Sequence, residues 1–201
     1  MSTPPASRAG GLAVERLPAW QRARWQRIVE AAGRVLAEQD YDDIQIRDVA
    51  EAADVARATL YRYFSSKEHL YACVLHEWST AGRDDPESPS QGPAEERVRG
   101  YIHTVIGALE RRPQFFRALI ILQNASDPNA KKLMADIGEG SLARLTGLFD
   151  VLGPGRAEDT AMMLWAIIHT LTLRALFGSG EMSDVHRIAD RFIDSIASDL
   201  R

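Results

Sequence analysis

Cysteine is nearly absent from this sequence. Cys73 is the single cysteine among 201 residues, so no disulfide can form within the chain. A lone cysteine is typical of a protein from a reducing compartment, and we expect a cytoplasmic location. Two interpretations of Cys73 stay open: a small apolar residue inside a helix, or a redox-sensing thiol.

Long hydrophobic runs are also missing. The most apolar stretch, Met162 to Phe177, contains His169 and Arg174 and is shorter than the roughly 20 residues that a membrane-spanning helix needs. The N-terminal residues contain no apolar segment followed by a cleavage site, so we expect no signal peptide. The sequence therefore predicts a protein without a membrane partner.

The motifs of common enzyme classes do not occur. There is no nucleophile elbow, no Walker loop and no dinucleotide fingerprint after a strand. The triplet Gly153-Pro154-Gly155 has neither the lysine nor the strand of a phosphate loop. No two histidines have zinc-ligand spacing; they are His69, His76, His103, His169 and His186. We therefore expect no enzyme activity, no metal site and no cofactor.

What the chain does have is apolar residues at helical spacing, with no alternation typical of strands. The sequence predicts an all-α fold. Expected helices span residues 19–39, 67–80, 94–111, 113–124, 127–152, 157–177 and 183–200, with two shorter ones within 44–64. We predict three parts: a mobile arm over 1–18, a three-helix domain with a helix-turn-helix over 19–66, and a helical domain over 67–201.

The stretch 44–70 carries the helix-turn-helix pattern. Asp54 stands at the turn, where a residue tolerant of the left-handed backbone region is needed. From Val55 to Lys67 there are three basic residues and no acidic one. The second short helix is therefore expected to present a cationic face that fits a DNA major groove. Ser65 and Glu68 predict a capping box, with Lys67 in the first turn facing a phosphate.

The run from Trp25 to Leu75 resembles the DNA-binding motif of the TetR family of transcriptional regulators. The matching residues are Ala50, Val55, Thr59, Leu60, Tyr61, Tyr63, Phe64, Lys67 and Leu70. The chain departs from the family pattern at Gln45, where threonine is frequent, at Asp54, where glycine is common, and at Ala56, where serine caps the helix. Residues 45–47 and 53–56 also resemble the sterol-catabolism repressors of that family.

The resemblance implies a homodimeric repressor that leaves operator DNA when a small apolar effector binds, with lipids, steroids and acyl-CoA thioesters as candidates. The residues expected at DNA are Gln45, Arg47, Arg57, Thr59, Tyr61, Arg62, Tyr63 and Lys67. Two alternatives stay open: a regulator without an effector, and a helical small-molecule-binding protein or enzyme with a vestigial motif.

The segment Met162 to Ile168 is apolar on every face, so it has to be covered all round. A second copy of the chain would cover it in a four-helix dimer interface; the central helix of a monomeric bundle is the alternative. The residues expected in the interface are Trp165, Ile168, Thr172, Ile188, Phe192 and Ile196.

An effector cavity is expected in the C-terminal domain because large apolar side chains are abundant over 98–172. Most of the candidates, taken individually, are residue types found more often in a core than in a pocket. The candidates are Tyr101, Val105, Phe116, Ile120, Gln123, Asn124, Met134, Ile137, Leu145, Trp165 and His169. Three of them, Gln123, Asn124 and His169, would orient a ligand through a polar group at an apolar wall.

The N-terminal 27 residues form a second basic segment, with five arginines against Glu15 alone. Its first part, rich in proline, alanine and glycine, is either a leader without a role or an arginine arm that reaches a minor groove. A formal net charge of −4 does not exclude DNA binding, because the basic residues are concentrated in these two segments.

Overall fold

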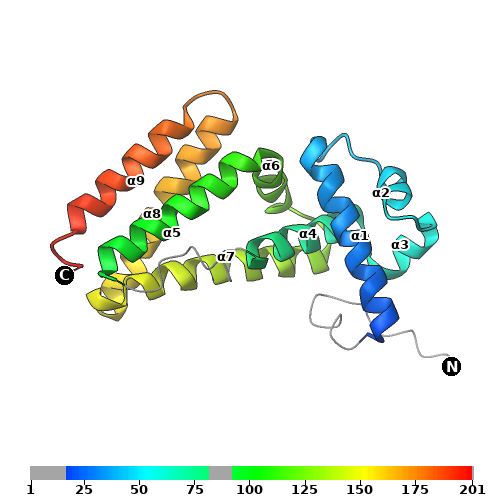
Figure 1. The fold of residues 1–201 in the computed structure, drawn as a ribbon, viewed down its shortest axis with the longest axis horizontal. Helices are drawn as coiled ribbons and strands as arrows, with labels where there is room; N and C mark the ends of the chain where they lie inside the picture. The colour runs from blue at the N-terminus through cyan, green and yellow to red at the C-terminus, as the bar shows by residue number, and fades with distance from the viewer. Residues whose placement is uncertain (1–16, 82–91, 201) are drawn as a thin grey trace. The chain divides into compact units, whose positions relative to one another are not determined.

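The computed structural model describes residues 17–81 and 92–200, and within these ranges all regular structure is helical (Figure 1). The predicted all-α fold is confirmed. The arm over 1–18 lies outside the described residues except for its last two positions. The acidic connection over 82–93 lies outside them except for Gly92 and Pro93.

The chain divides into two compact units. Unit 1 comprises residues up to 83 together with 114–137, and unit 2 comprises 84–113 together with 138–201. The helices of unit 1 are α1 (Ala19–Glu38), α2 (Ile46–Ala52), α3 (Arg57–Tyr63), α4 (Lys67–Ala81), α6 (Pro113–Leu122) and the first part of α7 (Pro128–Leu148). This division differs from the predicted boundary at residue 66, because α4 and α6 share a core with the N-terminal helices.

Helix α1 braces unit 1, as its apolar stripe predicts. It packs against α2 and α4 and buries Trp25, Ile28 and Leu36. The Trp25 ring stacks on Phe64 at 6.2 Å between centroids. Because Phe64 directly follows α3, this contact holds the end of α3 against α1.

Cys73 lies on α4 with 3% of its surface exposed. Burial is the main cause that raises the pKa of its thiol to about 12, so the thiolate that oxidation requires hardly forms near neutral pH. The position therefore supports the apolar-core interpretation of Cys73 over the redox-sensing one.

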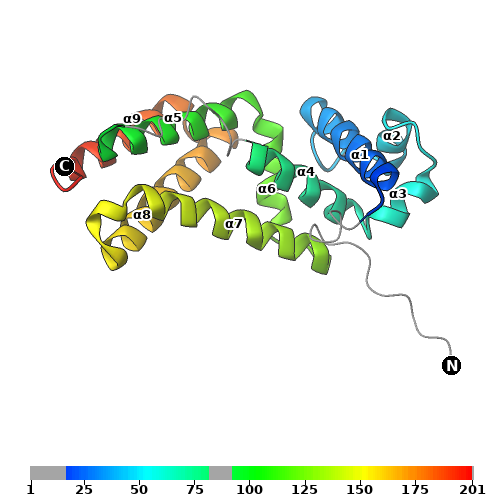
Figure 2. The same ribbon diagram turned by 60° about the horizontal axis from the view of Figure 1, so that its bottom comes forward.

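Unit 2 contains α5 (Ala94–Arg111), the remainder of α7, the short 3₁₀ helix η3 (Asp150–Leu152), α8 (Pro154–Leu176) and α9 (Met182–Ile196). Helices α5 and α8 both pack against α9 (Figure 2). Their core includes Ile102, Ile106, Leu164, Ala189 and Ile193, which are all almost fully buried. The burial follows from apolar residues three or four positions apart on each helix.

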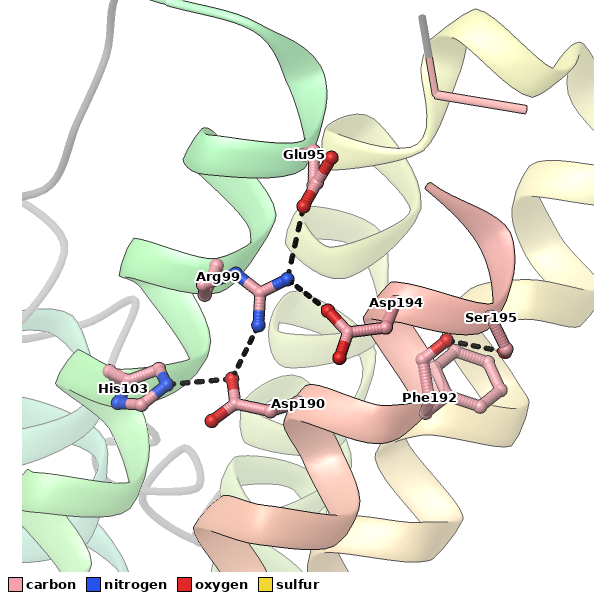
Figure 3. Close-up of polar contacts among 7 residues, drawn as sticks. All are labelled: Glu95, Arg99, His103, Asp190, Phe192, Asp194 and Ser195. Atoms are coloured by element: carbon pink, nitrogen blue, oxygen red, sulfur yellow. Dashed lines mark hydrogen bonds and ion pairs between the residues drawn. The ribbon is translucent and has the colours of Figure 1, made fainter. Parts of the chain in front are cut away.

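A polar network joins α5 to α9 at the edge of this core (Figure 3). The Arg99 guanidinium donates to Glu95 at 3.0 Å, to Asp190 at 2.8 Å and to Asp194 at 2.6 Å. His103 Nε2 lies 2.9 Å from the same Asp190 oxygen that Arg99 contacts. Burial raises the pKa of Asp190, but hydrogen bonds from His103 and Arg99 outweigh it and leave the pKa below its ordinary value.

Several helix ends differ from the sequence prediction. Helix α8 begins at Pro154 and not at 157, because proline suits the first helical turn, where its missing N–H costs nothing. Helix α7 ends at Leu148, before η3, and α9 ends at Ile196 and not at 200. The predicted N-cap of α7 is confirmed: Asp127 accepts hydrogen bonds from the backbone N–H groups of Asn129 and Ala130.

Candidate nucleic-acid interface

The turn between α2 and α3 is built around Asp54. Asp54 has a φ of 52°, the left-handed conformation expected for this position. The N–H of Val55 donates to the carbonyl of Ala50 at 3.0 Å, and the N–H of Asp54 donates to that of Glu51 at 3.0 Å. These two bonds form a Schellman motif that ends α2 and sets the direction of α3.

Helix α3 is anchored on one side and exposed on the other. Leu60 is fully buried, and Phe64, just beyond the helix, is 1% exposed. On the outer side, Arg57, Tyr61 and Arg62 are exposed, and 44% of the Tyr61 surface is accessible. The Arg57 guanidinium lies 5.6 Å from the centroid of the Tyr61 ring, so the two side chains form one cationic and aromatic surface.

The other residues predicted to contact DNA differ in how far they are exposed. Gln45 and Arg47 are exposed at the start of α2, where Arg47 Nε pairs with Asp48 at 3.1 Å. Thr59 is partly buried. Tyr63 is partly buried as well and packs against the unit 1 core, so only part of its side chain faces outward.

Lys67 differs most from its predicted arrangement. Its ammonium donates a hydrogen bond to the backbone carbonyl of Tyr41 and lies 4.3 Å from the Tyr41 ring centroid. Burial lowers the pKa of Lys67, although Asp42 and Asp43 act in the opposite direction. The side chain therefore points into unit 1 in this structure, and a phosphate would have to share this ammonium with Tyr41.

The predicted capping box at the start of α4 is displaced by one residue. The N–H of His69 donates to Ser66 Oγ at 3.0 Å, so Ser66 is the N-cap where Ser65 was expected. The Glu68 carboxylate accepts hydrogen bonds from Ser126 and Asp127. A partner 58 or 59 residues away leaves no trace in local sequence spacing.

Ala56 is the N-cap of α3 and provides no side-chain hydrogen bond. We expect Ala56→Ser to raise the free energy of unfolding by about 1 kcal/mol, because the hydroxyl would accept a hydrogen bond from an unpaired N–H of the first turn. Thermal or denaturant unfolding measures the change. Ala58→Ser is the matched control, since Ala58 is exposed inside the same helix and cannot act as a cap. An equal effect at both positions would contradict the capping argument.

The predicted effector residues are divided between the two units. Unit 1 contains Phe116, Ile120, Gln123, Asn124, Met134 and Ile137; unit 2 contains Tyr101, Val105, Leu145, Trp165 and His169. Ile137 and Leu145 are buried in the cores of their own units, and Phe116 is 5% exposed, whereas Gln123 and Asn124 are exposed near the end of α6. The His169 ring stacks on Trp165 at 4.9 Å, and burial lowers the pKa of His169, which favours a neutral imidazole.

The predicted dimer residues also separate by burial. Ile168 is 7% exposed and Thr172 is 0% exposed in the single chain. Trp165 is exposed on α8, while Ile188, Phe192 and Ile196 are partly buried on α9. Other apolar side chains of this helix and its end, absent from the predicted interface residues, are also exposed: Met162, Met163 and Phe177 are 50%, 51% and 61% exposed.

Neither metal binding nor membrane insertion is expected from the sequence. Across 17–81 and 92–200, no three histidine, cysteine, aspartate or glutamate residues are grouped so that they could hold a metal ion. None of the helices described is sufficiently long and apolar to span a membrane.

An exposed cationic helix that follows a left-handed turn in a compact helical unit defines the class of helix-turn-helix DNA-binding proteins. Residues 28–74 match the family described as bacterial regulatory proteins, tetR family. An uncharacterized HTH-type transcriptional regulator of Mycobacterium tuberculosis is 31% identical over 174 residues, which cover 85% of this chain and 78% of the relative. The chain therefore belongs to the TetR family, whose members bind operator DNA as transcriptional regulators and are not enzymes.

The chain is also 32% identical over 120 residues to the HTH-type transcriptional repressor KstR of Rhodococcus jostii, a match that covers 59% of this chain and 56% of the repressor. The match thus spans little more than half the length of that relative. Among solved structures, a TetR regulator from Rhodococcus sp. RHA1 has a TM-score of 0.74 at 22% identity, covering 92% of this chain and all of that one.

A second similar fold is the regulator FadR of Bacillus subtilis in complex with stearoyl-CoA. Its TM-score is 0.66 at 19% identity, and the match covers 88% of this chain and all of that one. At these identities the two structures support the fold.

Proposed function

We propose that this chain is a homodimeric repressor that binds operator DNA through α3 and is released by a small apolar effector. The observation that carries the proposal is the outer face of α3. It presents Arg57, Tyr61 and Arg62 to solvent on a helix whose inner face is anchored by Leu60. A seven-residue helix of this kind fits the width of a B-DNA major groove.

The contacts divide by chemistry. We assign base edges and the adjacent backbone to Arg57, Thr59, Tyr61 and Tyr63, and phosphates to Gln45, Arg47, Arg62 and Lys67. Base edges give sequence specificity, whereas phosphate contacts give register and salt-dependent affinity. The stacked pair of Arg57 and Tyr61 is the centre of this assignment, because a guanidinium held by an aromatic ring is already oriented for a bidentate contact.

The dimer would form through the exposed apolar side of α8. Met162, Met163 and Trp165 are exposed on one short stretch of this helix, which is unusual for a surface that faces only water. A second copy would cover them in an isologous interface together with the partly buried Ile188, Phe192 and Ile196 of α9. Two copies would then contact the two halves of a palindromic operator.

The effector class is proposed from similarity and composition together. KstR of Rhodococcus jostii is similar over part of the chain, and the fold resembles a regulator that was solved with stearoyl-CoA. Within unit 2, the neutral His169 beside Trp165 joins a polar group to an apolar surface, which suits a fatty or steroidal ligand. Lipids, steroids and acyl-CoA thioesters are therefore the compounds to test.

A fluorescence-anisotropy titration tests the proposal. The full chain is titrated against labelled DNA from beside its own gene and against a scrambled duplex, at two salt concentrations. We expect the operator to bind at least about a thousandfold more tightly than the scrambled duplex. The complex is then challenged with fatty acids, steroids and their CoA thioesters, of which one class should release the protein.

Each outcome separates the alternatives. Specific binding that no compound disturbs would indicate a regulator without an effector of these classes. Binding no tighter than to scrambled DNA, across all regions that flank the gene, would contradict operator recognition. Saturable binding of a small molecule in that case would support a helical ligand-binding protein with a vestigial motif.

A further inference from the structure

The turn that follows α3 is tied to the loop before α7 by the Asp127 carboxylate. One carboxylate oxygen, Oδ2, accepts hydrogen bonds from Ser65 Oγ at 2.6 Å and from Ser66 Oγ at 2.8 Å. The other, Oδ1, accepts the backbone N–H groups of Asn129 at 2.8 Å and Ala130 at 3.2 Å. Oδ1 alone caps α7, so Oδ2 accepts hydrogen bonds only from the turn after α3.

A second carboxylate makes the reciprocal connection from α4. Glu68 Oε2 accepts hydrogen bonds from Ser126 N at 2.9 Å, Ser126 Oγ at 3.1 Å and Asp127 N at 2.7 Å. Asn129 Nδ2 donates to Ser65 Oγ at 3.1 Å. We call this set the latch; its members are Ser65, Ser66, Glu68, Ser126, Asp127 and Asn129.

The ionised form of Asp127 is stabilised within the latch. Burial raises the pKa of this carboxyl, but the hydrogen bonds from Ser65, Ser66 and the α7 backbone outweigh the effect and leave its pKa below the ordinary value. In the latch, the hydroxyl and amide donors therefore all converge on two carboxylates or on the Ser65 hydroxyl that one of them accepts from; the carboxylates are those of Glu68 and Asp127. Hydrogen bonds to charged acceptors are the stronger kind.

Negative charge in this position opposes DNA binding. The latch begins two residues after Tyr63, the last residue of α3, and lies in the same unit as the DNA-binding helices. Removing an acidic residue near a DNA interface ordinarily strengthens binding, since phosphate repulsion falls. A contribution of these carboxylates to operator affinity must therefore come from the geometry that they impose.

We propose that the latch positions α3 for operator recognition, with Glu68 and Asp127 as positioning residues that do not touch DNA. The latch fixes the point where the chain leaves α3 against the start of α7. Together with the Asp54 turn at the other end, it holds both ends of the seven-residue recognition helix. This inference rests on the proposed operator binding by α3.

Three variants test the latch in the full-length protein. Glu68→Ala removes three hydrogen bonds from Ser126 and Asp127. Ser65→Ala removes the contacts of its hydroxyl with Asp127, Asn129 and His69, and both variants leave the Ser66 cap of α4 intact. We expect each to weaken operator binding about tenfold or more, equivalent to about 1.4 kcal/mol, without weakening binding to scrambled DNA. Glu68→Gln is the rescue variant: all three hydrogen bonds go to one oxygen, which the amide oxygen can replace, so its affinity should stay within about threefold of the unmodified protein.

Glu77→Ala is the matched control, because Glu77 is exposed on the same helix and its loss removes the same charge. Electrostatics alone predicts that Glu68→Ala and Glu77→Ala both bind DNA as tightly as the unmodified protein or more tightly. That result would overturn the proposal, as would a loss of affinity in Glu68→Gln equal to that in Glu68→Ala.

Hydrogen exchange distinguishes failure of the latch from failure of operator binding. In the DNA-free protein, Glu68→Ala and Ser65→Ala should accelerate amide exchange over α3 and at Ser126 and Asp127, while α9 remains unchanged. Unchanged exchange over α3 would contradict the positioning role even if no operator is found. Faster exchange over the whole of unit 1 would indicate a general loss of stability and would also reject a specific role for α3.

Discussion

Replacement of Tyr61 by alanine is expected to weaken operator binding by about 1–3 kcal/mol for each half-site, with little change in binding to scrambled DNA. Tyr61 is 44% exposed on the outer face of α3, and its ring lies 5.6 Å from the Arg57 guanidinium. The substitution removes an aromatic contact and also releases Arg57 from its held orientation. Competition anisotropy against operator variants measures both losses, since sequence specificity should relax at the base pairs that face Arg57 and Tyr61.

Two companion variants separate the causes. Tyr61→Phe retains the ring and the contact with Arg57, so its operator affinity should fall only by the contribution of the hydroxyl. Arg62→Ala should instead lower the salt dependence of log affinity by about 0.9 for each half-site, the slope for one lost phosphate contact, and leave base preference unchanged. Sedimentation should show the same oligomeric state for all three. Unchanged operator affinity in Tyr61→Ala would remove α3 from the DNA interface.

Replacement of Trp165 by glutamate is expected to separate the proposed dimer and lower operator affinity by about a hundredfold or more. Trp165 is 36% exposed on α8 beside Met162 and Met163. A carboxylate inside an apolar interface would lose its hydration without gaining a partner, which costs several kcal/mol in each of two copies. A monomer binds only one half-site and loses the advantage of two linked contacts.

Analytical ultracentrifugation over a concentration series measures the change in oligomeric state. Val151→Glu is the matched control, because Val151 is 49% exposed on η3, outside α8. We expect this control to remain dimeric and to bind DNA normally. Equal effects of the two variants would point to a general loss of stability, and a dimeric Trp165→Glu protein would place the interface on another surface.

Much of the proposed DNA-binding surface can be predicted from the sequence because its determinants are local. Helix spacing identifies Leu60 as the anchor of α3, and Asp54 is recognisable from the few residue types that tolerate a positive φ. The outward position of Arg57 and Tyr61 follows from the same periodicity, since they are four residues apart on one helix face. Each of these features depends on residues within one or two helical turns.

The apolar helix near the C-terminus could be predicted only in part. Its composition indicates that every face needs cover, but it does not show which face the chain covers itself. The structure buries Ile168 and Thr172 inside unit 2 and exposes Met162 and Met163. All four are compatible with a core or an interface, so periodicity could not separate them.

Helix positions, the left-handed turn and the cationic outer face of α3 were thus determined by the order of residues along the chain. The inward turn of Lys67 toward Tyr41 and the pairing of Glu68 with Ser126 were decided only by tertiary structure. These partners are separated by 26 and 58 residues. Charged side chains select whichever donors and acceptors the fold brings within about 3 Å, and nothing in local spacing specifies those neighbours.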